Sequence, residues 1–152
     1  IRFAPGTGEL GMFQGAKSYL LENSEGQTLD TYSISAGLDY ASVGPEHAWL
    51  KEIGRVNYSW ATDEEAMSAF KDLCETEGII PAIESSHAVA GAYKAAEDLK
   101  AKGYKHPVMI INISGRGDKD MNTAGKWFGY LTDEQAKALE ANGAQGNNAD
   151  GE

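Results

Sequence analysis

The sequence has 152 residues, of which 41% are hydrophobic and 24% charged, and this composition is typical of a soluble globular domain with one core. The formal net charge of −10 argues against binding to nucleic acid or anionic membranes. No apolar run reaches the roughly 18 residues of a membrane span, and the lone Cys74 excludes an intrachain disulfide or a cysteine-rich zinc site.

The first predicted elements are a strand, a helix and a second strand. Residues 17–22 form a short extended segment, and turn residues follow at 23–26. Pro45 suits the first position of a helix that ends near Gly54. Residues 56–60 then alternate apolar and polar side chains, as a half-buried strand does.

Two helices are predicted in the middle of the chain. Thr62 and Glu65 form a capping box, apolar residues follow at helical spacing, and Gly78 suits a left-handed C-terminal cap. Ser85 or Ser86 begins the next predicted helix.

The remaining segments indicate the fold class. Residues 108–113 are nearly all apolar, which is typical of a strand covered on both faces in a parallel sheet. A second capping box at 132–135 begins a C-terminal helix. Residues 143–152 lack a large apolar side chain, so we expect a disordered acidic tail there and a domain over residues 1–142. The order of elements predicts an α/β domain, a partial parallel sheet flanked by helices.

The strongest chemical signal follows the predicted buried strand. Ser114, Gly115 and Gly117 come directly after it, and ligands in open α/β sheets bind at the carboxyl ends of strands. Glycines let the backbone approach a ligand, and a serine hydroxyl offers a neutral hydrogen bond. The alternative is a surface turn with a local pairing of Arg116 with Asp118 or of Lys119 with Asp120, because the run matches neither a P-loop nor a dinucleotide fingerprint.

Glu84 ends an apolar segment at the predicted start of a helix. A carboxylate at that position is expected to be half-buried. The helix N-terminus favours its ionised form, and desolvation opposes it. The alternative is that Glu84 or Ser85 only caps the helix.

A long loop with several glycines occupies residues 35–47. Ordered loops of this length are often functional. Its carbonyl groups could bind a hard cation, and Asp39 could pair with a basic group elsewhere. The alternative is a plain connection into the helix that begins at Pro45.

Three segments together, residues 33–48, 77–88 and 112–120, closely resemble the tryptophan synthase β subunit. The resemblance covers about residues 8–121 and corresponds to the C-terminal portion of that subunit. It implies the fold type II architecture of pyridoxal-phosphate (PLP) enzymes. It also implies a cytoplasmic lyase of tryptophan biosynthesis that condenses L-serine with indole by β-replacement.

The resemblance implies roles for individual residues. Ser114 would hydrogen-bond the ring nitrogen of PLP, and Gly115 and Gly37 would line the ring. Glu84 matches a catalytic carboxylate that lies close to the cofactor and influences its protonation. Asp39 matches the residue that pairs with an arginine of a mobile domain when the site closes and excludes water.

A monovalent cation, Na⁺ or K⁺, is also implied, because the carbonyl groups of Leu38, Tyr40 and Ser42 fall where the family binds one. The sequence departs from the family in three respects: it has no His-Lys pair to supply the Schiff-base lysine, no Gly-Gly-Gly-Ser-Asn phosphate cup and no general acid/base glutamate. We therefore expect a C-terminal fragment that binds PLP weakly and is inactive alone.

The implied partners are the fragment's own N-terminal portion, the α subunit and a second β subunit, with L-serine and indole as substrates and with neither nucleic acid nor a membrane. An isolated fragment would leave a parallel sheet without neighbours and would expose strand edges and apolar surface. The alternatives are a β-like paralogue, another fold type II PLP lyase, or a non-catalytic anion-binding or interaction module built from half of the fold.

Overall fold

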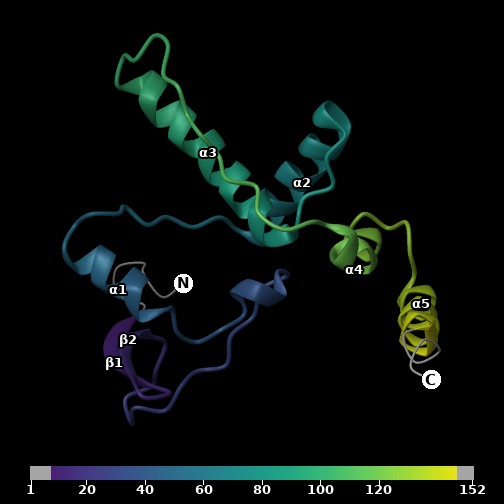
Figure 1. Ribbon diagram of the computed structural model, residues 1–152, viewed down its shortest axis with the longest axis horizontal. Coiled ribbons are helices and arrows are strands. Elements are labelled where there is room, and N and C mark those ends of the chain that lie inside the picture. Colours follow the sequence, from purple (N-terminus) through teal and green to yellow (C-terminus); the bar gives the residue numbers. More distant parts are fainter. Residues whose placement is uncertain (1–7, 147–152) are drawn as a thin grey trace.

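The computed structural model describes residues 8–146. A hairpin and the first helix lie on one side, two long helices diverge from the middle, and two further helices follow toward the C-terminus (Figure 1). The elements in order are β1 (Glu9–Phe13), β2 (Ala16–Leu20), the 3-10 turn η1 (Ala36–Leu38), α1 (Pro45–Glu52), α2 (Asp63–Glu77), α3 (Ile83–Ala101), the 3-10 turn η2 (Asp118–Asp120), α4 (Met121–Trp127) and α5 (Asp133–Gly146).

The hairpin of β1 and β2 is the sheet of the described segment. The strands are antiparallel, with Glu9 opposite Leu20. Gln14 and Gly15 both have positive φ angles, of 50° and 81°, as the two central residues of a type I′ hairpin turn require. The sequence predicted the second strand and not the first, whose Glu-Leu-Gly-Met pattern alternates weakly.

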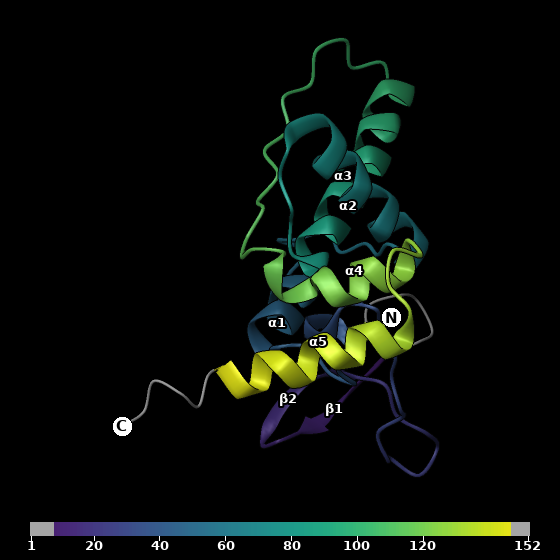
Figure 2. The same cartoon turned by 90° about the vertical axis from the view of Figure 1, so that its right-hand side faces the viewer.

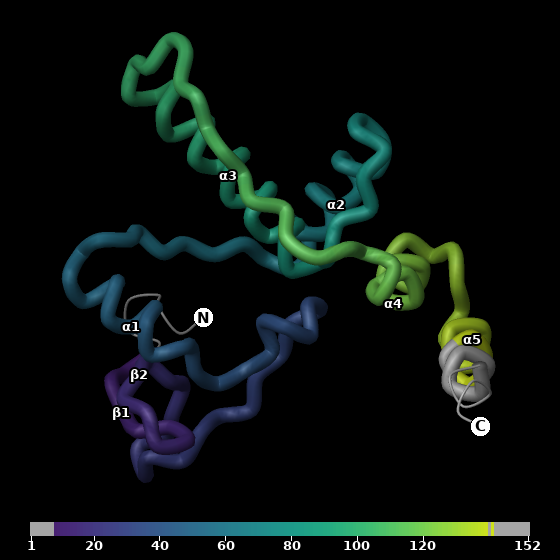
Figure 3. Tube along the Cα trace, viewed as in Figure 1, coloured from purple at the N-terminus to yellow at the C-terminus, as the bar shows by residue number. Residues whose placement is uncertain are grey.

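Helices α2 and α3 form the core with α4. Met67, Phe70, Ile83 and Ala124 are buried together. The capping box of Thr62 and the left-handed C-terminal cap at Gly78, with a φ of 65°, are both present as the sequence predicted. The two long helices meet at the start of α3 and splay apart from there, as the chain trace also shows (Figure 3).

The predicted parallel sheet is not formed within residues 8–146, where β1 and β2 are the paired strands and their pairing is antiparallel. Residues 56–60 and 108–113 run without regular secondary structure. Val108 and Ile110 are 93% and 97% exposed. A strand forms only when a neighbour accepts and donates its backbone hydrogen bonds, and residues 8–146 place no other strand beside 108–113.

Two helix boundaries differ from the prediction. Helix α3 begins at Ile83, before Ser85, because the carboxylate of Asp120 accepts the Ile83 N–H at 3.0 Å and replaces a local cap. Helix α5 continues to Gly146, into the segment expected to be a tail, and residues 147–152 of that tail lie outside the described residues. No helix between residues 8 and 146 is long and apolar enough to cross a membrane.

Candidate functional site

Three segments that are distant in the sequence meet at the first turn of α3. The Gly37 N–H donates to Oε1 of Glu84 at 2.9 Å. The Ser85 hydroxyl donates to the carbonyl of Ser114 at 2.7 Å, and the two hydroxyl oxygens are 3.3 Å apart. The loop of η1 and the loop after residue 113 are thus both attached to α3. These contacts bring together Gly37, Glu84 and Ser114, which the sequence assigned to one site.

The charge of Glu84 is balanced by Lys119. Nζ of Lys119 lies 2.9 Å from Oε2 of Glu84 and 2.8 Å from Oδ2 of Asp120. Burial raises the pKa of Glu84, but the hydrogen bonds from Lys119 and from backbone N–H groups outweigh it and lower this pKa to about 2. Burial lowers the pKa of Lys119, and its bonds to Asp120 and Glu84 more than restore it, so that the net shift is upward. At neutral pH Glu84 is therefore ionised and paired with the ammonium group of Lys119.

Glycine is required at two close approaches in the site. A Cβ at Gly37 would lie 2.7 Å from Oε1 of Glu84. A Cβ at Gly117 would overlap the carbonyl of Pro81, while the Gly117 N–H donates to the Ile80 carbonyl at 3.1 Å. Gly115 has a φ of 68°, in the left-handed region that favours glycine. The 114–120 loop thus follows a path that side chains at these positions would block.

Asp39 lies at the end of η1. Its Oδ1 is buried without a hydrogen-bond partner among the described residues, and so is Oγ of Ser35. A buried, unpaired carboxylate oxygen costs free energy unless another group satisfies it. Asp39 therefore offers an acceptor that the described part of the chain does not use.

The three residues assigned to a cation lie along the same loop. Leu38 closes η1, Tyr40 is 62% exposed, and the Ser42 hydroxyl donates to the Tyr19 carbonyl at 3.0 Å. The described residues contain no cluster of three His, Cys, Asp or Glu side chains suited to a metal. The predicted ligands of the cation are backbone carbonyl groups and not side chains of these types. The cation site therefore stays a prediction.

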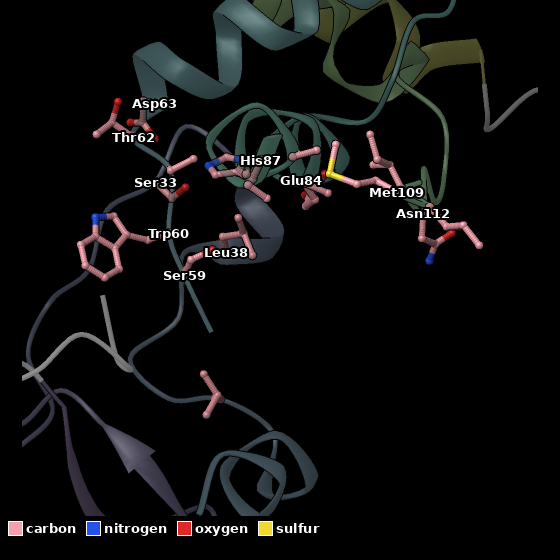
Figure 4. A pocket seen from close by; sticks show the side chains of 18 of the residues that line it. Ser33, Leu38, Ser59, Trp60, Thr62, Asp63, Glu84, His87, Met109 and Asn112 are labelled. Atoms are coloured by element: carbon pink, nitrogen blue, oxygen red, sulfur yellow. The ribbon is translucent and has the colours of Figure 1, made fainter. Parts of the chain in front are cut away.

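A cavity of about 940 Å³ opens beside Glu84. Figure 4 shows Glu84 and His87 from α3 facing Leu38 and Ser33 of the η1 loop, with Trp60 and Met109 at the margins. Nδ1 of His87 lies 2.8 Å from the Ile83 carbonyl, which fixes the ring. Its walls come from the η1 loop, residues 59–63, helix α3 and residues 109–112.

The structure separates the predicted residues into two groups. Gly37 donates to Glu84, and Ser114 is hydrogen-bonded to Ser85, the residue after Glu84. Oδ1 of Asp39 takes no part in these contacts. Sequence reasoning missed Ser85, Lys119 and Asp120 as members of the site. Lys119 and Asp120 were visible only as a possible local pair, and no sequence signal indicated that they reach the start of α3.

Comparison with known proteins identifies the matched segment. No family model matches the chain. A protein of Mycobacterium tuberculosis named tryptophan synthase beta chain is 60% identical over 124 residues, which cover 82% of this chain and 28% of that protein. The proteins of the same name from Mycobacterium leprae and Streptomyces coelicolor are 58% and 50% identical over 121 and 137 residues, covering 80% and 90% of this chain.

The chain is homologous to tryptophan synthase beta chains. It spans only about 28% of the length of these relatives, in the C-terminal portion. The homology supports a fragment of a fold type II PLP enzyme. It agrees with the resemblance to the C-terminal portion of that family.

Proposed function

We propose that this chain supplies one wall of the PLP site of a tryptophan synthase β subunit, which condenses L-serine with indole to L-tryptophan and water. The observation that carries the proposal is the meeting of Gly37, Glu84 and Ser114 at the start of α3, in a chain 50–60% identical to tryptophan synthase beta chains. The alternatives are a β-like paralogue or a non-catalytic module built from half of the fold.

The residues present fit one end of the cofactor. Ser114 provides a neutral hydroxyl beside Gly115, whose missing side chain leaves the backbone open. Residues 109–112, which lead into Ser114, line the cavity beside Glu84. Bound PLP withdraws electrons from an amino acid attached to it. A neutral hydroxyl at the ring nitrogen does not force that nitrogen to be protonated, which favours elimination and replacement over transamination. Ser114 would therefore orient the ring without adding charge.

Glu84 would influence the protonation of the cofactor, and Asp39 would help to close the site to water. The ionised Glu84 carboxylate is held by Gly37 and Lys119 and would influence the protonation of a cofactor in the adjacent cavity. The unpaired Oδ1 of Asp39 would receive an arginine from a mobile domain. Closure of that pair would exclude water and retain indole.

A cation and a larger sheet complete the proposal. The carbonyl groups of Leu38, Tyr40 and Ser42 would bind Na⁺ or K⁺, because backbone carbonyls are suitable ligands for hard cations. Residues 108–113 would become a strand of a parallel sheet, since exposed apolar side chains and an unpaired backbone need a neighbour. The lysine and phosphate cup that anchor PLP would come from polypeptide outside this chain, so the chain alone would be inactive.

A chimaera tests the proposal. In it, this chain replaces the matching 124 residues of the Mycobacterium tuberculosis beta chain. We expect the chimaera to bind PLP and to convert L-serine and indole to L-tryptophan, while the 152-residue chain alone shows neither turnover nor a borohydride-reducible PLP adduct. The matched control is the chimaera with Ser114→Ala, which should bind PLP with altered absorbance and lower activity. A folded, PLP-loaded chimaera without turnover would favour the paralogue.

A further inference from the structure

We propose that Lys119 is the positioning residue of this site, which holds the Glu84 carboxylate in place and ties the 114–120 loop to the start of α3. The inference rests on the proposed function only for the role of Glu84 in the protonation of the cofactor. The two oxygens of Glu84 are divided: Oε1 accepts the Gly37 N–H at 2.9 Å, and Oε2 accepts from Nζ of Lys119 at 2.9 Å. One carboxylate thus joins two loops.

The contacts close into a ring. Lys119 also contacts Oδ2 of Asp120 at 2.8 Å, and that oxygen accepts the Ile83 N–H at 3.0 Å. Because Ile83 and Glu84 are consecutive in the first turn of α3, the path from Glu84 through Lys119 and Asp120 returns to its starting point. Removing Lys119 opens this ring at its only cation and leaves two carboxylates beside each other.

Repulsion between those carboxylates gives Lys119 its importance. The Asp120 side chain is 13% exposed and the Glu84 side chain 27%, so water screens them only in part. Two negative groups that contact the same ammonium group repel each other once that group is removed. Burial raises the pKa of Glu84, and the hydrogen bonds from Lys119 and from backbone N–H groups outweigh it and lower this pKa to about 2. Without Lys119, Glu84 would either take up a proton or turn away from Gly37.

Other lysines in the described range have simpler pairs. Lys94 contacts the single carboxylate of Glu65 at 2.6 Å, and Lys126 contacts that of Asp133 at 3.7 Å. Exposed single pairs of this kind contribute little to stability. Lys126 is therefore a matched control: its side chain is 43% exposed against 51% for Lys119, and it lies outside the proposed site.

The first test measures the Glu84 carboxyl by ¹³C NMR in the cofactor-free 152-residue chain, across acidic pH, with Lys119→Met, Lys119→Arg and Lys126→Met. We expect the pKa of Glu84 to rise from about 2 toward its ordinary 4.5 in Lys119→Met. It should stay low in Lys119→Arg and be unchanged in Lys126→Met. The amide of Gly37 should exchange its hydrogen faster in Lys119→Met alone.

The second test uses the chimaera and its pH profile of turnover. Lys119→Met should lower kcat and shift the acidic limb upward, Lys119→Arg should restore both in large part, and Lys126→Met should match the parent. Equal loss in Lys119→Met and Lys119→Arg, or a Glu84 pKa near 4.5 in the unsubstituted chain, would overturn the inference. If Lys119→Met does not fold, two other measurements still test the inference. These are the pKa of Glu84 in the unsubstituted chain and the turnover of the Lys119→Arg chimaera. An inactive chimaera with the expected NMR shifts would instead count against the proposed function.

Discussion

At the residue scale, the carboxylate of Glu84 joins two loops and a lysine through its two oxygens. Its position at the start of a helix was predictable, because an apolar run leads into it. Its partner was not, because Lys119 is 35 residues away in the sequence and reaches Glu84 only through the fold of the 114–120 loop. The glycines of that loop were predicted to let the backbone approach a ligand, which stays a prediction; within the chain, Gly117 allows a close approach to the Pro81 carbonyl.

Glu84→Gln should make stability depend less on pH. The pKa of Glu84 is lowered in the folded chain, so its contribution is present above the ordinary pKa of 4.5 and is lost as the pH falls toward 2. We expect Glu84→Gln to lower the melting temperature at pH 7, and the difference from the parent chain to shrink between pH 4.5 and 2. The control is Glu75→Gln, whose 3.7 Å pair with Lys71 is exposed. A difference that stays constant with pH would contradict the prediction.

Gly37→Ala should disturb the site without disturbing the core. A methyl group there would lie 2.7 Å from Oε1 of Glu84, so either the carboxylate or the η1 loop must move. We expect the pKa of Glu84 to rise, because the Gly37 N–H bond that lowers it is weakened. The ¹³C titration used for Lys119 measures this change. Gly44→Ala is the control, since the nearest atom to its new methyl group is 3.9 Å away.

At the scale of elements, local signals located the helices and long-range contacts set their ends. Helix α2 begins after Thr62 and ends before Gly78, as predicted, because both of its caps are formed by residues close in the sequence. Helix α3 begins earlier than predicted because its cap comes from Asp120, 37 residues away. The apolar run 108–113 predicted a strand, but a strand needs a partner, and pairing is a property of the whole sheet.

Ile110→Thr should change the stability of the isolated chain less than that of the complete fold. Ile110 is 97% exposed in the chain, so we expect the free energy of unfolding to change by no more than about 0.5 kcal/mol there. In the chimaera the same change should destabilise by roughly 1 kcal/mol or more, because 108–113 would be a covered strand. Met67→Ala, at a fully buried position, should cost about 2–5 kcal/mol in both proteins. Chemical denaturation measures all three, and an equally small effect of Ile110→Thr in both would argue against the parallel sheet.

At the scale of the whole molecule, the chain is a branched arrangement of helices rather than a closed layer (Figures 1 and 2). Its buried core is small and lies where α2, α3 and α4 meet. Large apolar side chains remain exposed on several elements, among them Trp49 at 58%, Tyr130 at 78% and Ile110 at 97%. Motif spacing predicted the resemblance to the family, and the chain spans 28% of the length of the relatives that it matches.

Such a surface should bind the remainder of the fold when it is supplied separately. We expect the 152-residue chain, mixed with the complementary N-terminal part of the Mycobacterium tuberculosis beta chain, to co-elute with it in size-exclusion chromatography. The reason is that pairing along 108–113 would satisfy an unpaired backbone and cover apolar side chains at once. Ile110→Asp should abolish this association, because a charge on a covered strand is costly, whereas Lys126→Met should leave it intact. PLP should then bind to the pair and to neither piece alone. Association that survives Ile110→Asp would mean that the two pieces contact each other elsewhere on the chain. It would contradict the proposed strand pairing along 108–113 and would leave the homology to tryptophan synthase beta chains unaffected.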